Sequence, residues 1–189
     1  MISKNKNHKA ANRKNDGRPD GDKSAPNVGT PARSIVLLQG AFAVKFFDQL
    51  EKKNLKKIFV TEGRPNLEAA TVNCRELIRR KITPTLISDN MAGFLFYKNL
   101  VQEVWIAYQL FDSKGAVCDI GALILGVLGK QHHIPVYLFP SGRRKNFMGK
   151  EKDLMSFKNK MIAPRGIRAY VPLIEWLPAK YITKIYSAK

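Results

Sequence analysis

Two polar turns carry side chains that could bind an anionic ligand, and each turn follows an apolar run. Arg64 lies in the first turn, and Asp89 and Asn90 open the second, with Gly93 just beyond them. An arginine can hold a phosphate through two parallel N–H groups. A helix that begins after such a turn presents free backbone N–H groups that favour an anion. The two turns therefore predict a site for a phosphorylated small molecule.

The same residues also have a structural interpretation. Arg64 paired with Asp89 would brace the ends of two strands, and Asp89 or Asn90 would serve as the N-cap of a helix. Gly93, which has no side chain, would let another backbone or a ligand approach the start of that helix. Ligand binding and structural bracing both stay open on these residues alone.

Apolar runs that alternate with amphipathic runs are expected to position these turns. The expected strands are 34–39, 57–61, 83–89, 103–110 and 134–139, and the expected helices are 41–50, 67–80, 91–97 and 120–130. Alternation of this kind is typical of parallel βαβ units. The sequence therefore predicts an α/β fold: a three-layer Rossmann-like domain with a mostly parallel sheet.

The run 83–89 is the expected centre of this fold. Its apolar residues suit a strand that is buried on both faces, and ligands in open α/β sheets bind at the carboxyl ends of strands. We therefore expect the other strand ends to converge on the turn that begins at Asp89. The remaining expectations are a loop at 111–116, one more strand at 170–174 and a terminal helix at 178–186.

The chain is strongly basic, with 33 Lys and Arg residues against 15 Asp and Glu residues and a net charge of +18. Such a charge attracts phosphorylated metabolites, nucleic acid or anionic surfaces, although much of it can also be solvated surface. The two cysteines, Cys74 and Cys118, make neither a disulfide framework nor a metal-binding spacing. We expect a cytoplasmic protein without a membrane span, because no apolar run is long enough to cross a bilayer and no secretory signal is visible.

Two segments concentrate the basic residues. Residues 1–33 hold almost no bulky apolar side chain and are expected to be a disordered basic tail, which leaves 34–189 as the domain. Residues 141–161 form a basic excursion, with aromatic side chains between the Lys and Arg residues of 143–160. Either segment could contact nucleic acid through phosphates and base stacking. The alternative interpretations are a linker for the tail and a mobile surface loop for the excursion.

Several familiar cofactor motifs are missing from the sequence. The turn after the first expected strand, 39–44, lacks the three-glycine spacing of a dinucleotide site, and no phosphate-binding Gly-Lys-Ser/Thr loop occurs. His132 and His133 are adjacent, so they do not face one site on a helix, and we interpret them as partners of a helix C-terminus. The sequence therefore predicts no cofactor and no metal.

Three stretches, taken together, resemble one known family. Residues 61–65 resemble its Glu-x-Arg-Pro turn, residues 89–93 its Asp-Asn-Met-Ala-Gly turn, and residues 112–121 its Asn-Gly-x-x-Asn-Lys-x-Gly segment. The family comprises the α, β and δ subunits of translation initiation factor 2B and their relatives methylthioribose-1-phosphate isomerase and ribose-1,5-bisphosphate isomerase. The resemblance covers 34–140 and, more weakly, 170–185. It implies a Rossmann-like fold and a homodimer or a complex with a related subunit, because the family dimerises through this domain.

The departures from the isomerases concern the residues that do their chemistry. The resemblance places a catalytic cysteine after the first strand, where residues 37–41 contain none, and a catalytic aspartate at Gln109. It places an Asn-Lys pair against the substrate, where this chain has Cys118 and Asp119. Aldose–ketose isomerisation needs a group that moves a proton, and Gln109 does not titrate. An aspartate in place of the lysine also repels a phosphate.

These departures favour a degenerate, non-catalytic member of the family that acts by binding a phosphorylated ligand or a partner. The ligand-binding residues would be Arg64, Asp89, Asn90, Gly93 and Gln109. The alternative is an aldose–ketose sugar-phosphate isomerase with a rearranged site, whose proton chemistry would come from Asp89, Asp112, Asp119 or Cys118. A third hypothesis is an RNA- or ribosome-associated basic protein.

Overall fold

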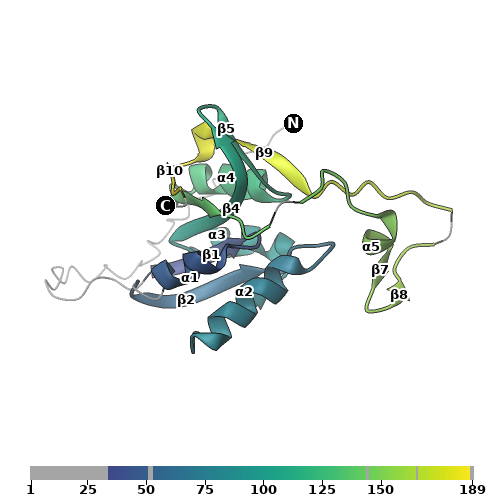
Figure 1. Cartoon of the computed structure of the whole chain (residues 1–189), viewed down its shortest axis with the longest axis horizontal. Helices are drawn as coiled ribbons and strands as arrows, with labels where there is room; N and C mark the ends of the chain where they lie inside the picture. Colours follow the sequence, from purple (N-terminus) through teal and green to yellow (C-terminus); the bar gives the residue numbers. More distant parts are fainter. Residues whose placement is uncertain (1–33, 51–52, 144, 165, 188–189) are drawn as a thin grey trace, which may run out of the picture. The chain divides into compact units, whose positions relative to one another are not determined.

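A mostly parallel sheet forms the centre of the structure, a computed structural model that describes residues 34–50, 53–143, 145–164 and 166–187. The parallel strands lie in the order β10-β6-β4-β1-β2-β3, and Figure 1 labels β10, β4, β1 and β2 among them. Their bounds are β1 (Ser34–Gln39), β2 (Leu55–Thr61), β3 (Thr85–Ile87), β4 (Glu103–Asp112), β6 (Val136–Pro140) and β10 (Lys184–Ile185). The predicted α/β fold with a mostly parallel sheet is confirmed, and the tail predicted at 1–33 lies outside the described residues.

Helices cover both faces of this sheet and make three layers. Phe47 belongs to the core on one face and Phe96 to the core on the other. β1 serves both cores, because successive side chains of a strand point to opposite faces: Leu38 packs with the first and Leu37 with the second. The helices are α1 (Val44–Leu50) and α2 (Glu68–Arg79) on the first face, and α3 (Ala92–Tyr97) and α4 (Ala122–Gln131) on the second.

The strand expected at 83–89 is shorter and less central than predicted. β3 is at the edge of the sheet, where it pairs with β2 among the described residues. Leu86 is 55% exposed, so the expectation of a strand buried on both faces is wrong. β1 and β4 occupy the middle instead, because their apolar runs are longer and have neighbours on both sides.

The prediction of a loop at 111–116 is also wrong. β4 continues to Asp112, and the chain returns as β5 (Gly115–Asp119), which pairs antiparallel with β4 and with β9 (Ile174–Pro178). The Asp112 carboxylate closes the turn by accepting the backbone N–H groups of Lys114 at 2.7 Å and Gly115 at 3.2 Å. This side-chain-to-backbone bonding is typical of aspartate in tight turns. The hairpin carries Asp119 back beside the end of β1.

The structure of residues 178–186 also differs from the prediction, because this segment pairs with the edge of the sheet. The expected helix at 178–186 is a single 3₁₀ turn, η2 (Ala179–Tyr181), followed by the short strand β10. Backbone N–H groups of Thr183 and Tyr186 each donate to a carbonyl of β6 at 2.8 Å. The open edge of β6 supplies these acceptors, which a local helix prediction does not take into account. The extra strand expected at 170–174 lies further on, as β9.

Between β6 and β9 the chain leaves the sheet (Figure 1). This excursion, residues 141–173, contains the predicted basic segment 141–161. It forms α5 (Glu151–Met155) and a small antiparallel hairpin of β7 (Ser156–Phe157) and β8 (Lys160–Met161). Its two limbs are joined at the base, where the N–H of Gly149 donates to the carbonyl of Val171 at 2.8 Å. The excursion then returns the chain to β9.

Candidate functional site

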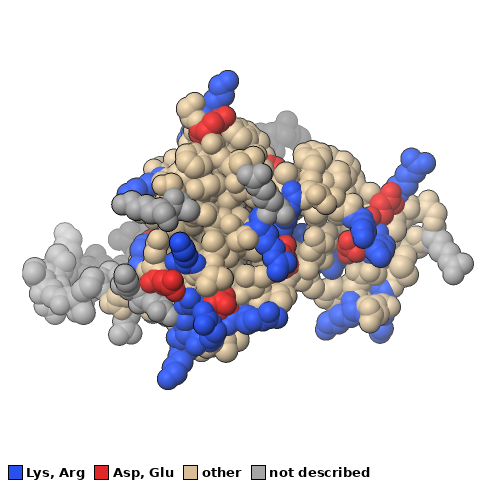
Figure 2. Space-filling view, in the orientation of Figure 1, with Lys and Arg blue, Asp and Glu red and all other residues tan. Residues whose placement is uncertain are grey.

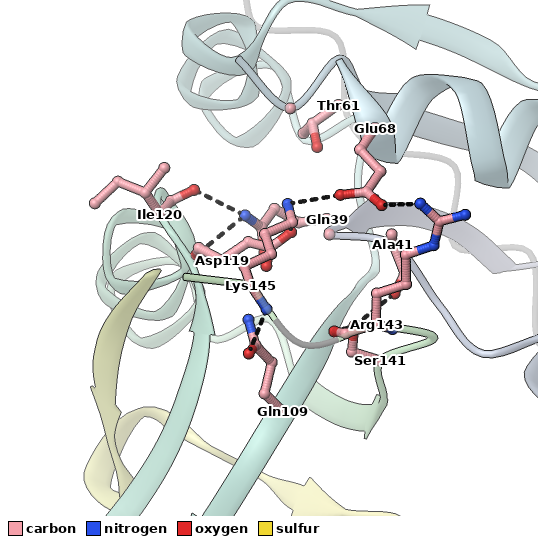
Figure 3. Close-up of polar contacts among 12 residues, drawn as sticks. Gln39, Ala41, Thr61, Glu68, Gln109, Asp119, Ile120, Ser141, Arg143 and Lys145 are labelled. Carbon is pink, nitrogen blue, oxygen red and sulfur yellow. Dashed lines mark hydrogen bonds and ion pairs between the residues drawn. The ribbon is translucent and has the colours of Figure 1, made fainter. Parts of the chain in front are cut away.

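Polar side chains meet at the carboxyl ends of the central strands. Gln39 is the last residue of β1, Asp119 is the last residue of β5, and Gln109 lies in β4. Lys145 reaches the same place from the excursion (Figure 3). We call this place the strand-end cleft. It is lined by 39–40 after β1, the turn 63–66 between β2 and α2, residues 119–120 after β5, and Lys145 and Leu173 of the excursion.

Gly40 makes the close approach of these strand ends possible. Its φ of +81° is a backbone conformation that residues with a side chain rarely adopt. A Cβ atom there would lie 3.0 Å from the Cβ of Ala107 and 3.3 Å from a carboxylate oxygen of Asp119. The fully buried Asn73 of α2 fixes the same turn, because its Nδ2 donates to the Gly40 carbonyl at 2.8 Å and its Oδ1 accepts the Phe42 N–H at 3.2 Å.

A buried ion pair closes the strand-end cleft. The Lys145 ammonium donates to the Asp119 carboxylate, with 2.6 Å between Nζ and Oδ2. The two side chains are only 11% and 8% exposed. Glu68, at the start of α2, lies 3.7 Å from the same ammonium and 3.1 Å from the Arg143 guanidinium. Figure 3 shows these charged groups arranged around Lys145.

Two glutamines complete the polar surroundings of this ion pair. Gln39 donates through Nε2 to the carbonyls of Ile120 at 2.9 Å and Asp119 at 3.3 Å, and Gln109 accepts the backbone N–H of Lys145 at 3.0 Å. Among the described residues, the buried Gln39 Oε1 and Gln109 Nε2 atoms have no hydrogen-bond partner. The Gln39 amide therefore leaves an acceptor free beside the ion pair.

Burial governs the ionisation of the acid in this cleft. Loss of solvent raises the pKa of Asp119 above its usual value, and the Lys145 ammonium opposes that rise. Burial likewise raises the pKa of the Cys118 thiol. Cys118 is fully buried in the apolar core on the α3–α4 face, so of these two residues only Asp119 contributes to the strand-end cleft.

Little free space is left once Lys145 is in place. The remaining volume of the strand-end cleft is about 10 Å³, which is about the volume needed for one water molecule. A sugar phosphate does not fit beside the Lys145–Asp119 ion pair. Any ligand of that size would have to displace Lys145.

Asp89 makes the structural contacts of the bracing alternative, not those of a helix N-cap. Its carboxylate accepts the backbone N–H groups of Gly63 and Arg64, both at 2.8 Å. It caps no helix, because its own 3₁₀ turn, η1 (Asp89–Met91), has Ser88 at the N-cap without a side-chain cap bond. The structural alternative is therefore right in outline: Asp89 braces the ends of β2 and β3, through the backbone of Arg64 rather than through its guanidinium.

The Arg64 side chain contacts the excursion. Its Nη2 donates to the Leu154 carbonyl at 3.3 Å, and its guanidinium lies 5.1 Å from the centre of the Phe157 ring. Arg64 also lines the strand-end cleft, so it joins the excursion to the cleft. Its guanidinium is engaged with neutral groups of the chain itself.

The other predicted residues are not brought into the strand-end cleft. The Asn90 side chain accepts the Ser88 hydroxyl at 3.0 Å, and Asp112 closes the β4–β5 turn. A Cβ atom at Gly93 would meet nothing within 4 Å, so no close approach by the described chain explains that glycine. Of the predicted residues, Arg64, Gln109 and Asp119 meet at the cleft, and its centre lies at β1 and β5 rather than at the turn after β3.

Sequence reasoning missed Gln39, Glu68 and Lys145 as members of the site. Lys145 is one of seven basic residues in the predicted excursion, and nothing in its neighbourhood distinguishes it from the other six. Gln39 carries a weak signal, because a polar residue that ends an apolar strand before a glycine is often at a strand-end site. Glu68 opens an amphipathic helix, where an acidic residue is expected in any case.

The fold and the cleft together define a class: α/β proteins with a polar site at the carboxyl ends of a mostly parallel sheet. Residues 27–188 match the model of the Initiation factor 2 subunit family, and the chain belongs to that family. This result confirms the resemblance seen in the sequence. No helix in the described part of the chain is long and apolar enough to cross a membrane.

Curated relatives of the chain include sugar-phosphate isomerases. It is 33% identical over 149 residues to the methylthioribose-1-phosphate isomerase of Carboxydothermus hydrogenoformans, which covers 72% of this chain and 43% of the relative. The chain thus spans less than half the length of this curated relative.

Solved structures of this fold come from both branches of the family. The translation initiation factor eIF-2B subunit delta from A. fulgidus has a TM-score of 0.70 at 22% identity, with 80% of this chain and 51% of that chain covered. The 5-methylthioribose 1-phosphate isomerase of Pyrococcus horikoshii has a TM-score of 0.69 at 20% identity, with 81% and 49% covered. At these identities the likeness shows the shared fold alone.

Proposed function

We propose that this chain is a non-catalytic member of the Initiation factor 2 subunit family that acts by binding a second copy of itself or a related subunit. The observation that carries the proposal is the Lys145–Asp119 ion pair, which fills the strand-end cleft. The resemblance places the catalytic aspartate of the isomerases where this chain has Gln109. It places their lysine where this chain has Asp119. A cleft filled by the protein's own side chains supports binding elsewhere on the surface rather than turnover.

The charge of the cleft gives a phosphorylated ligand little support. A phosphate that entered would meet the carboxylates of Asp119 and Glu68, and the Lys145 ammonium already lies between them. Two like charges within a few ångströms repel strongly where water is excluded. The phosphorylated ligand stays a prediction, and it requires Arg64 to leave Leu154 and Phe157.

An exposed apolar surface on the α3–α4 layer suits a protein partner. Phe94 and Tyr97 of α3 are 53% and 73% exposed, and Ile124 and Val127 of α4 are also exposed. The two helices are in contact, so these side chains share one face. Apolar groups gathered on a surface mark interaction sites in soluble proteins, and solved relatives include an initiation factor subunit.

The proposal is tested by two measurements on the purified full chain. We expect no ketose product from methylthioribose-1-phosphate under conditions in which the Carboxydothermus hydrogenoformans isomerase turns over. We expect sedimentation velocity to show a species larger than the 21.4 kDa monomer, and we expect Phe94→Asp to reduce its fraction. Arg75→Asp, at an exposed position of α2 on the other face of the sheet, is the matched control. Sustained turnover, or an assembly unchanged by Phe94→Asp, contradicts the proposal.

An isomerase with a rearranged site is the second candidate. It is favoured by the 33% identity to a methylthioribose-1-phosphate isomerase and by Asp119, whose raised pKa suits an acid that transfers a proton. If this alternative holds, Asp119→Asn abolishes the turnover of methylthioribose-1-phosphate by the chain. Asp112→Asn, which changes a carboxylate outside the cleft, leaves turnover intact. Turnover that survives Asp119→Asn would exclude Asp119 as the acid.

The basic excursion is the observation behind a nucleic-acid partner. Residues 141–173 contain nine Lys or Arg and two Asp or Glu residues, and Figure 2 shows basic side chains over this part of the surface. Phe147 and Phe157 are 61% and 39% exposed among them. Filter binding to single-stranded RNA at two salt concentrations tests this candidate, because phosphate contacts weaken as salt rises. Affinity that does not change with salt contradicts it.

A further inference from the structure

Two carboxylates of the strand-end cleft lie beside a single ammonium group. Asp119 Oδ2 lies 2.6 Å and Glu68 Oε2 lies 3.7 Å from Lys145 Nζ. Gln39, whose residue is 5% exposed, adds the unpartnered acceptor Oε1 at the end of β1. An ammonium group carries three N–H donors and no acceptor. The three acceptors therefore suit a primary ammonium group and no anion.

These acceptors belong to the body of the domain, whereas the ammonium does not. Gln39, Glu68 and Asp119 lie on β1, α2 and β5, whose positions are set by the sheet and its helices. Lys145 lies on the excursion, beyond Ser141, whose N–H donates to the Tyr108 carbonyl at 2.7 Å. Without the Lys145 side chain, the body would present two carboxylates and an amide oxygen to whatever entered the cleft.

We propose that the strand-end cleft is a binding site for a small primary amine, and that the chain's own Lys145 side chain fills it in this structure. The amine would donate to Asp119, lie beside Glu68 and use the free Gln39 oxygen. This preference goes beyond the proposed function, since it concerns what the cleft accepts and not what the α3–α4 surface binds. It also reverses the charge preference of a site that holds a phosphate.

Chemical rescue of Lys145→Ala tests the proposal on the full chain. This substitution removes three carbons and the ammonium, which are the atoms of the propylammonium ion. We expect the substitution to lower Tm by roughly 6–20 °C, since it leaves a buried carboxylate unpaired. We expect propylammonium chloride to raise that Tm by about 2 °C or more at a concentration several times its Kd. Tetramethylammonium chloride, which has the same charge but no N–H donor, should not.

Two further variants make the test specific. Lys150→Ala removes an exposed lysine of the same excursion and should show no shift with propylammonium beyond that of tetramethylammonium. The double variant Lys145→Ala/Asp119→Asn should lose the rescue, because the charged acceptor is gone. If Lys145→Ala alone does not fold, the yield of refolding from urea in each salt replaces Tm as the readout.

The proposal is overturned by any of three results. They are an equal propylammonium effect on the Lys145→Ala and Lys150→Ala variants, a rescue that survives Asp119→Asn, and a stronger stabilisation of Lys145→Ala by inorganic phosphate than by propylammonium. Each result would leave the Lys145–Asp119 contact as an ion pair that is structural only. Because none of the readouts involves turnover or assembly, failure here leaves the proposed function standing.

Discussion

Two aspartates end up beside the same strand ends, but their surroundings differ. Asp89 is exposed and accepts two backbone N–H groups of the turn after β2. Asp119 is buried and accepts the ammonium of Lys145, which comes from a separate excursion. The first carboxylate is satisfied by neutral donors that the chain must present wherever this turn forms. The second depends on one charged side chain, so the same residue type braces a turn in one place and closes a cleft in the other.

The largest effect on stability is expected when the cation is removed from the buried pair. Lys145→Met leaves the Asp119 carboxylate buried without its partner, and we expect a loss of about 3–5 kcal/mol in the free energy of unfolding. Urea denaturation measures the loss. Lys150→Met, at an exposed position of the excursion, should stay within about 0.5 kcal/mol of the parent. The double variant Lys145→Met/Asp119→Asn should recover more than half of the loss, and no recovery would mean that the pairing is not the cause.

The next largest effect is expected at the buried amide that fixes the cleft wall. Asn73→Ala leaves the Gly40 carbonyl and the Phe42 N–H without their hydrogen bonds, and we expect a cost of about 2–4 kcal/mol. Asn66→Ala, at an exposed position of the β2–α2 turn, is the matched control and should cost far less. Equal costs in urea denaturation would show that burial of Asn73 does not matter.

A smaller effect is expected at the exposed aspartate. Asp89→Ala removes two hydrogen bonds to N–H groups that water can then solvate, so we expect a loss of about 1–2 kcal/mol. Asp89→Asn keeps one acceptor oxygen and should lose less. Hydrogen exchange of the Gly63 and Arg64 amides should speed up in Asp89→Ala, whereas the amides of the buried strand β1 should not. Unchanged exchange of the Gly63 amide would show that Asp89 does not brace this turn.

The smallest effect concerns pH. Burial raises the pKa of Asp119 in the folded state above its ordinary 3.8, so the folded chain holds this proton more tightly than the unfolded chain. The stabilisation linked to that proton is complete below pH 3.8 and is lost as pH rises through the folded-state pKa. Relative to Asp119→Asn, the parent should therefore lose stability as pH increases above 3.8. A parent curve that rises against Asp119→Asn in this range contradicts the direction of the pKa shift.

Particular residues show how far the sequence predicts the fold. The alternation of apolar strands and amphipathic helices is a local signal, and it correctly gave β1, β2, α2 and α4 to within a few residues. The β4–β5 hairpin was missed, because Asp112 forms its turn with only two residues between the strands. β10 was missed because it exists only as a partner of the β6 edge.

The candidate site was predicted less completely than the fold. Arg64, Gln109 and Asp119 do meet at the strand-end cleft, as positions aligned by their strands should. Asn90 and Gly93 do not, because they follow β3, an edge strand that β2 separates from β1. Lys145 could not be chosen from among the basic residues, since its partner Asp119 is 26 residues away in the chain.

The sequence by itself determined the alternation of the main strands and helices, the family and the absence of a titratable group at position 109. These features depend on residues that are close together in the sequence, because periodicity and turn preferences extend over only a few positions. Only the tertiary structure decided that the cleft is filled by a lysine, whose ammonium lies beside the carboxylates of Asp119 and Glu68. An ion pair between distant elements forms only after the sheet has placed both charges in one region with little water, where their attraction is strong and partly offsets the loss of solvation.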